Sequence, residues 1–206
     1  FPKIAEKYVM INLKDANGDD RPTDTYLEQV NDTTVRGYRC STGWSKQQQV
    51  YFTAVFSEPV HLALYHDSIS VQGSILQGVD VKGNIIVASD VEKLDMKVGI
   101  SPVSMENAAA NIQQEIADWN FERIVGETTA KWNAELSKLQ VTTTDTVAKR
   151  IFYTALYHAF IQPTMFNDYN KEYRGTDKNV YGDPGFTNYT VFSLWDTYRA
   201  AHPLYT

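Results

Sequence analysis

The spacing of apolar residues changes once along this chain, and that change limits what its 206 residues can fold into. Before Pro102 the apolar residues recur at every second position in several short runs. After Pro102 they recur at about every third or fourth position. The first spacing is that of a strand with one buried face, and the second is that of an amphipathic helix. The sequence therefore predicts a β-rich part and then an α-rich part, divided near residue 104.

The β-rich part contains several candidate strands at the spacing of a β-sandwich. Residues 50–57 are β-branched and aromatic, and residues 60–65 place Val60, Leu62 and Leu64 on one face. Residues 93–100 alternate apolar with polar or small residues, which predicts a half-buried strand with these apolar side chains on its buried face: Leu94, Met96, Val98 and Ile100. Glycine-containing pairs predict turns at residues 72–73, 77–78 and 82–84.

The α-rich part predicts four helices. Ser104 is a candidate cap for the first, whose apolar face consists of Ala108, Ile112, Ile116 and Trp119. The second covers residues 121–139, although Gly126 weakens it. The third begins at Asp145 and ends before Pro163, with His158 near a buried face made of Val147, Ile151, Phe152, Ala155, Leu156 and Phe160. Residues 192–201 predict a last helix that ends before Pro203.

A long loop is predicted between the third and the last helix, over residues 167–188. Its oxygen-bearing side chains are of the kind that Ca²⁺ prefers, but their spacing does not follow the Asp-x-Asp-x-Asp-Gly pattern of a calcium loop. Solvated turn residues are therefore the better interpretation of Asn167, Asp168, Tyr173, Arg174, Asp177, Asp183 and Asn188. Long loops in a packed domain are often functional, so this segment remains a candidate site.

The strongest candidate for binding chemistry is the pair Trp195–Asp196 near the end of the chain. An indole ring can stack on the apolar face of a sugar, while a carboxylate accepts hydrogen bonds from two neighbouring hydroxyls. Adjacent residues of a helix point about 100° apart, so both can face one pocket only near a helix start or a bend. The competing interpretation is structural, with Trp195 at a helix interface and Asp196 as a cap.

Composition excludes several other classes of function. The net charge is −6 and no run of Lys or Arg forms a stripe, so we expect no nucleic-acid partner. No apolar stretch approaches the roughly 18 residues of a membrane span. The four histidines lack metal-ligand spacing, and the single Cys40 excludes an internal disulfide. Phosphate-loop and Gly-x-Ser-x-Gly motifs are absent from the sequence, so nothing supports nucleotide-driven chemistry or serine hydrolysis.

Several motifs in order resemble those of glycoside hydrolase family 92, the calcium-dependent exo-acting α-mannosidases. They are residues 51–57 (YFTAVFS), 98–101 (VGIS), 106–111 (ENAAAN), 152–158 (FYTALYH), 173–175 (YRG) and 192–204 (FSLWDTYRAAHPL). The resemblance covers most of residues 50–206. It implies an N-terminal β-sandwich and a C-terminal (α/α)6 barrel, with this chain as a middle segment of a longer protein. The expected divisions are residues 1–103 for the end of the sandwich, 104–143 for connecting helices and 144–206 for the first barrel helices.

The resemblance also implies a reaction. Members of the family invert the anomeric configuration with a carboxylic acid and a carboxylate base, and calcium binds the hydroxyls of the terminal mannose. Carried over, Trp195 would form a wall of the pocket for that mannose and Asp196 would accept hydrogen bonds from its hydroxyls. The acid, the base and most calcium ligands are expected beyond Thr206, so no catalytic residue and no metal ligand is assigned within the chain. We expect the segment alone to be inactive.

From this resemblance we expect the parent protein to release terminal mannose from mannose-rich glycans, with α-1,2 linkages favoured. We expect it to be secreted or periplasmic. The expected partners are mannose-terminated glycans and the remainder of the same protein. The alternative is a non-catalytic sugar-binding fragment or relic that keeps only the subsite for the terminal mannose.

Overall fold

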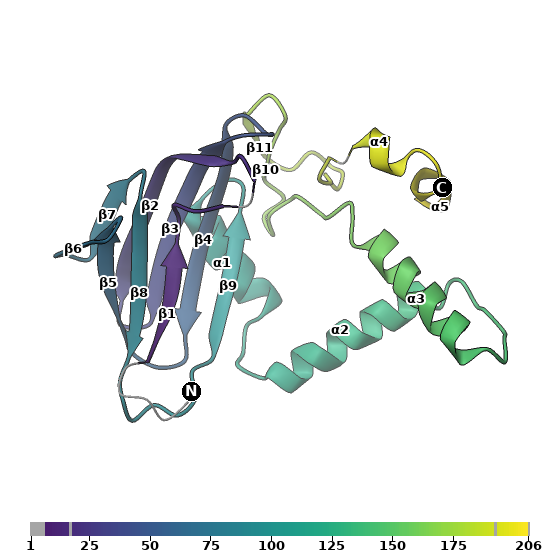
Figure 1. The fold of residues 1–206 in the computed structure, drawn as a ribbon, viewed down its shortest axis with the longest axis horizontal. Helices are drawn as coiled ribbons and strands as arrows, with labels where there is room; N and C mark the ends of the chain where they lie inside the picture. Colours follow the sequence, from purple (N-terminus) through teal and green to yellow (C-terminus); the bar gives the residue numbers. More distant parts are fainter. Residues whose placement is uncertain (1–6, 17, 192, 206) are drawn as a thin grey trace. The chain divides into compact units, whose positions relative to one another are not determined.

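A computed structural model describes residues 7–16, 18–191 and 193–205 of the chain (Figure 1). These residues form two compact units. The first combines Phe1–Trp119 with Asp168–Pro184, and the second combines Asn120–Asn167 with Gly185–Thr206. A β-rich part followed by helices is confirmed. The finer limits, 1–103, 104–143 and 144–206, stay a prediction.

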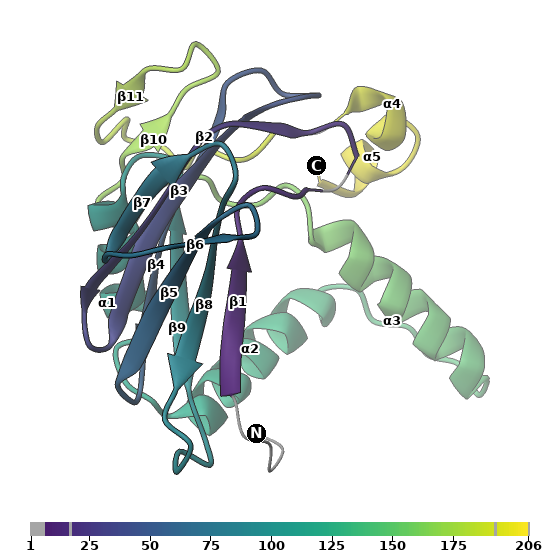
Figure 2. The same cartoon turned by 60° about the vertical axis from the view of Figure 1, so that its left-hand side comes forward.

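The first unit is an antiparallel β-sandwich (Figures 1 and 2). One sheet has the order β1-β8-β5-β6, with the bounds Lys7–Asn12, Val81–Val87, Val60–His66 and Ile69–Val71. The other has the order β7-β2-β3-β4-β9, with the bounds Ile75–Gly78, Arg21–Asn31, Thr34–Thr42, Gln48–Phe56 and Met96–Ser101. Strands of both sheets alternate buried with exposed positions, as a sandwich requires.

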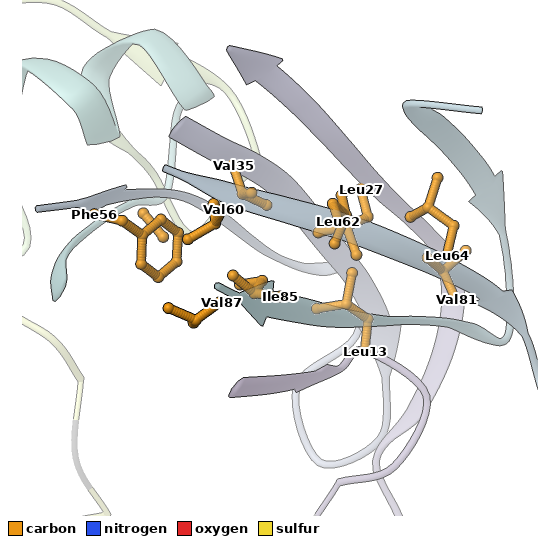
Figure 3. Close-up of a cluster of buried hydrophobic side chains, with 11 residues drawn as sticks. Leu13, Leu27, Val35, Phe56, Val60, Leu62, Leu64, Val81, Ile85 and Val87 are labelled. Atoms are coloured by element: carbon orange, nitrogen blue, oxygen red, sulfur yellow. The ribbon is translucent and has the colours of Figure 1, made fainter. Parts of the chain in front are cut away.

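The hydrophobic core lies between the two sheets. Figure 3 shows its side chains meeting from the facing strands, with Phe56, Val60 and Val87 toward one end and Leu64 and Val81 toward the other. The predicted inward face of residues 60–65 is confirmed, because Val60, Leu62 and Leu64 of β5 are all buried. Burial of such side chains contributes about 1.5–3 kcal/mol each, so this cluster is the main stabilising element of the unit.

The predicted burial of the apolar face of β9 is wrong. The alternation itself is present, but Lys97, Gly99 and Ser101 are the buried residues, whereas Met96, Val98 and Ile100 are exposed. The reason is that helix α1 (Met105–Glu115) packs on the face that carries the small and polar residues. A Cβ on Gly99 would lie 2.1 Å from the carbonyl oxygen of Ala108, so only glycine permits this approach.

Two predicted turns are also wrong. Gln77–Gly78 lies within β7, and residues 82–84 lie within β8. A Cβ on Gly83 would come within 2.5 Å of the Leu27 side chain and 2.8 Å of the Leu62 side chain. This glycine therefore serves close packing between the sheets and not a change of chain direction.

Helix α1 begins and packs as its sequence predicts. The Ser104 hydroxyl accepts a hydrogen bond from the Asn107 amide at 3.0 Å, and Ala108 and Ile112 are buried. Beyond the helix, the Lys97 ammonium donates to the Ala117 carbonyl at 3.2 Å and lies 4.0 Å from the centroid of the Trp119 ring. Trp119 stays exposed, so its predicted place on the buried face is wrong.

The second unit contains the helices α2 (Phe121–Leu136), α3 (Thr146–Phe160), α4 (Leu194–Thr197) and α5 (Ala201–Tyr205). Gly126 does not interrupt α2, which runs through it. The Asp145 carboxylate caps α3 by accepting from two backbone amides, as predicted. Apart from Leu156 the apolar face of α3 is not buried, and no residue of α2 is buried. Trp132 and Tyr157 do pack together, with ring centroids 4.5 Å apart.

The predicted last helix is shorter and divided. Phe192, where it was expected to begin, lies outside the described residues. The helix α4 starts at Leu194, and Pro203 lies inside α5. Proline is compatible with the first turn of a helix, because the N–H that it lacks has no partner there.

Candidate functional site

The Trp195–Asp196 pair lies on α4, a single helical turn. Trp195 is 84% exposed and Asp196 is exposed as well. Asp196 lies inside α4, whose N-cap is Ser193 and has no side-chain capping hydrogen bond, and the Asp196 backbone amide donates to the Ser193 carbonyl at 3.2 Å. The two side chains are therefore available to a ligand, one as an aromatic face and the other as an acceptor of hydroxyl protons.

Residues after the pair hold this short segment in place. The Thr197 hydroxyl donates to the Ser193 carbonyl at 3.0 Å and lies 2.9 Å from Nε2 of His202. The Tyr205 hydroxyl lies 3.0 Å from the Ala159 carbonyl and 2.7 Å from the Gln162 carbonyl. Since Ala159 belongs to α3, Tyr205 joins α5 to the end of that helix.

The approach to α4 is fixed by a short backbone pairing. Met165 forms an antiparallel bridge with Tyr189, and the amides of Phe166 and Thr190 donate to the carbonyls of Asn188 and Thr164, each at 2.8 Å. The ends of the predicted loop are thus brought together, and the loop is closed before the chain enters α4.

The most highly organised polar cluster belongs to the first unit and is centred on Asp168. This carboxylate is only 5% exposed, which contradicts its interpretation as a solvated turn residue. It accepts from the Ser101 hydroxyl at 2.6 Å, from Nδ2 of Asn107 at 2.9 Å and from Nδ2 of Asn111 at 2.9 Å. The donors come from β9 and α1, so Asp168 fastens the segment 168–184 to the sandwich unit. A buried carboxylate needs such donors to offset the loss of its hydration.

Glu172 extends this cluster toward the surface. Its Oε2 accepts from Nδ2 of Asn107 at 2.8 Å and from Nδ2 of Asn170 at 2.9 Å. These hydrogen bonds, with that from Asn107 the largest, lower the pKa of the Glu172 carboxyl below its ordinary value. Asn107 therefore bridges the carboxylates of Asp168 and Glu172 with a single amide group.

This cluster does not fit a calcium ion. The carboxylate oxygens of Asp168 and Glu172 already accept from amide and hydroxyl donors, whereas Ca²⁺ requires six to eight oxygen ligands directed at it. Over residues 7–16, 18–191 and 193–205, no group of three or more His, Cys, Asp or Glu side chains could hold a metal ion. We therefore assign no metal ligand to the described residues.

The middle of the predicted loop is a small hairpin of β10 (Tyr173–Arg174) and β11 (Val180–Tyr181). The Asp177 carboxylate accepts from the Tyr181 hydroxyl and from the Asn179 side chain, and these bonds lower the pKa of Asp177. Arg174 donates to the carbonyls of Lys178 and Gln47 at 3.2 and 3.0 Å. These contacts explain the hairpin's shape and assign it no chemistry.

Other candidate side chains are inert or misplaced. His158 is exposed on α3, so its interpretation as a core histidine is wrong. Burial raises the pKa of the Cys40 thiol, which keeps it protonated and poorly nucleophilic.

In the part of the chain that is described, no helix is long and apolar enough to cross a membrane.

Sequence reasoning missed the Asp168 cluster. Ser101, Asn107 and Asn111 are separated from Asp168 by more than fifty positions, and no local pattern connects them. The only available signal was the spacing of Asn107 and Asn111, four residues apart and thus on one face of a helix.

Two family models match the chain in succession. The glycosyl hydrolase family 92 N-terminal domain matches residues 1–101, and the glycosyl hydrolase family 92 catalytic domain matches residues 107–206. A comparison with curated proteins gives no match.

Solved structures give the same result over the whole chain. The family GH92 α-mannosidase BT3965 from Bacteroides thetaiotaomicron is 34% identical, with a TM-score of 0.92 over 100% of this chain and 29% of its own. The family GH92 inverting mannosidase BT2199 from the same organism is 25% identical, with a TM-score of 0.82 over 97% of this chain and 27% of its own. The chain thus spans less than a third of the length of these relatives, and with both of its parts matched in order it belongs to glycosyl hydrolase family 92.

Proposed function

We propose that this chain is part of an exo-acting α-mannosidase that releases terminal mannose from mannose-rich glycans. The observation that carries the proposal is the 34% identity to an α-mannosidase over the whole length of the chain, at a TM-score of 0.92. The same relative has also been solved in complex with mannoimidazole, and this second structure is 33% identical with a TM-score of 0.91.

Trp195 and Asp196 are the residues that we propose for contact with the terminal mannose. Their exposure on α4 supports this role, because among the described residues Trp195 is 84% exposed and Asp196 is exposed as well. A carboxylate that accepts from two vicinal hydroxyls fixes the orientation of the sugar, and an aromatic face adds apolar contact area.

The finer features of the reaction belong to the proposal as well. Inversion is supported by the name of the inverting mannosidase BT2199. Inversion needs an acid and a base about 6.5–9.5 Å apart, and we place both outside residues 1–206. We expect calcium dependence and a preference for α-1,2 linkages from the family resemblance, with most of the calcium ligands outside this chain.

We further propose that the protein acts in a secreted or periplasmic location, where mannose-rich glycans are accessible. Its partners are then mannose-terminated glycans and the remainder of its own polypeptide, without nucleic acid. Fractionation of the native host would test the location, since recovery of the protein in the cytoplasm alone would contradict it.

Mannose release from α-1,2-, α-1,3- and α-1,6-linked mannobioses tests the proposed activity. It should be measured for the longest native product of the gene and for the 206-residue chain, with calcium and with a chelator. We expect the longer protein to release mannose in a calcium-dependent manner and the 206-residue chain to be inactive.

The alternative is a non-catalytic sugar-binding fragment or relic that keeps only the subsite for the terminal mannose. Mannose binding without release by the longest native product would support it and would contradict the enzyme.

A further inference from the structure

The helix α4, which carries Trp195 and Asp196, is too short to be stable through its own hydrogen bonds. It has four residues, and Ser193 at its start makes no side-chain capping hydrogen bond. A single turn fixes several backbone dihedral angles in return for one hydrogen bond, so an isolated turn does not persist in water. The conformation of α4 therefore depends on contacts with other parts of the second unit.

Thr197 is the residue through which α4 makes such a contact. It is half-buried, whereas Leu194, Trp195 and Asp196 are exposed. The Thr197 hydroxyl donates to the Ser193 carbonyl at 3.0 Å, and the Asp196 amide donates to the same carbonyl at 3.2 Å. Because both donors share one acceptor, the position of the Asp196 backbone depends on the Thr197 hydroxyl.

The single proton of the Thr197 hydroxyl determines which nitrogen of His202 is protonated. A hydroxyl group has one proton to donate and two lone pairs that can accept. Since the proton is directed at the Ser193 carbonyl, the hydroxyl oxygen accepts from Nε2 of His202, which lies 2.9 Å away. Nε2 of His202 therefore carries a proton.

His202 is in turn connected to α3. It belongs to α5, which lies next to α4 in both views (Figures 1 and 2). The ring of Tyr205, also on α5, packs edge-on against the His202 ring with centroids 6.3 Å apart, and its hydroxyl lies 3.0 Å from the Ala159 carbonyl of α3. A continuous series of contacts thus runs from α3 through Tyr205, His202 and Thr197 to α4.

We infer that His202 is a positioning residue for the proposed mannose contact. Its Nε2–H holds the Thr197 hydroxyl, and this hydroxyl fixes the turn from which the Asp196 carboxylate reaches the sugar. A binding group must be held within about 10–20° of its productive direction, and an exposed carboxylate on a single turn needs such support from neighbouring residues. The inference rests on the proposed role of Asp196, since His202 acts on the sugar only through Thr197 and Asp196.

A double-mutant cycle on the longest native product tests the inference. Thr197→Val removes the hydroxyl at nearly constant volume and should lower kcat/KM for mannobioses about 3- to 12-fold, the equivalent of one hydrogen bond. In the Asp196→Ala background the same change should cost less than about twofold, because the carboxylate that Thr197 positions is already absent. Equal losses in both backgrounds would assign Thr197 a merely structural role and would overturn the inference.

Conservative variants separate the donated proton from the bulk of the ring. His202→Leu should lower kcat/KM about as much as Thr197→Val, whereas His202→Gln retains an N–H donor and should recover most of that loss. The matched control is Ser137→Ala, which removes a hydroxyl that donates to the Ala134 carbonyl at 3.0 Å at the end of α2 and should leave kcat/KM unchanged. Equal activities of His202→Leu and His202→Gln would overturn the inference.

The proton on His202 gives a readout that does not depend on activity. Histidine-selective ¹⁵N NMR of the longest native product, with the signal assigned by its absence in His202→Gln, should show a proton on Nε2. A ring protonated on Nδ1 alone would overturn the inference.

Failure of this inference can be distinguished from failure of the proposed function. Asp196→Ala with full activity would contradict the mannose contact and, with it, the positioning role. Lower activity in Asp196→Ala without any loss in Thr197→Val would overturn the positioning role alone.

Discussion

The hydroxyl of Ser101 donates to Oδ2 of Asp168 at 2.6 Å, which joins the last residue of β9 to the first residue of the segment 168–184. The same carboxylate also accepts from Asn107 and Asn111 on α1. One buried acceptor thus holds a strand, a helix and a distant segment together. The three donors are neutral. The burial of the Asp168 carboxylate is therefore offset by hydrogen bonds and not by an opposite charge.

Replacing Asp168 by alanine should lower the free energy of unfolding by about 3 kcal/mol, because three donors lose a buried charged acceptor. Chemical denaturation of the variant beside the wild-type protein measures this loss. The matched control is Asp183→Asn, which removes an exposed ion pair with Lys171 and should change stability by less than about 1 kcal/mol. Equal stability of Asp168→Ala and the control would refute the role of the cluster.

The pKa of Glu172 should lie below its ordinary value of 4.5 and should rise in Asn107→Ala. Asn170→Ala should raise it less, because the bond from Asn107 is the larger cause. A carboxyl whose folded pKa is depressed stabilises the fold above its unfolded pKa. This contribution is therefore complete above pH 4.5 and is lost as the pH falls through the folded pKa. Carboxyl ¹³C chemical shifts across the acid range measure the pKa, and an unshifted Glu172 would contradict the hydrogen bonds.

Gly99→Ala and Gly126→Ala should change stability in opposite directions. At Gly99 the added Cβ would meet the Ala108 carbonyl oxygen at 2.1 Å, and this overpacking should cost about 1–3 kcal/mol or more. At Gly126 an added Cβ would meet nothing within 4 Å apart from the adjacent residues and backbone of its own helix, so alanine should stabilise α2 by about 0.5–1 kcal/mol. Thermal unfolding of both variants checks the pair. A tolerated Gly99→Ala would show that α1 does not pack on β9 as closely as described.

Asp196→Ala in the longest native product should lower kcat/KM for mannosides roughly 10- to 150-fold, the equivalent of about 1.5–3 kcal/mol for hydrogen bonds to a charged group. Its unfolding temperature should stay unchanged, because Asp196 is exposed and is not the N-cap of α4. Initial rates on mannobioses and a thermal scan of the same preparation provide both readouts. A lower unfolding temperature with full activity would instead assign Asp196 a structural role.

The sequence by itself determined the succession of a β-rich and an α-rich part and the kind of several elements within them. β-Branched and aromatic composition placed β4, period-two alternation placed β5 and β9, and the helical period with its caps placed α1 and α3. These patterns are local, since alternation reflects the two faces of a strand and a cap reflects the unpaired amides of a helix start. The motif that contains Trp195 and Asp196 could also be recognised from the sequence, because its residues are adjacent in the chain.

Only the tertiary structure decided which face of an element is covered and by what. The sequence predicted the alternation along β9. Which face of the strand is covered depends on α1, which contacts Gly99 and leaves Val98 exposed. Gly83 suggests a turn in the sequence and proves to be a packing site within β8. In the sequence Asp168 was interpreted as a solvated loop residue. In the structure it is buried and accepts hydrogen bonds from donors on β9 and α1. In each case the deciding partner lies far away in the sequence, and a local pattern carries no information about a contact that only folding creates.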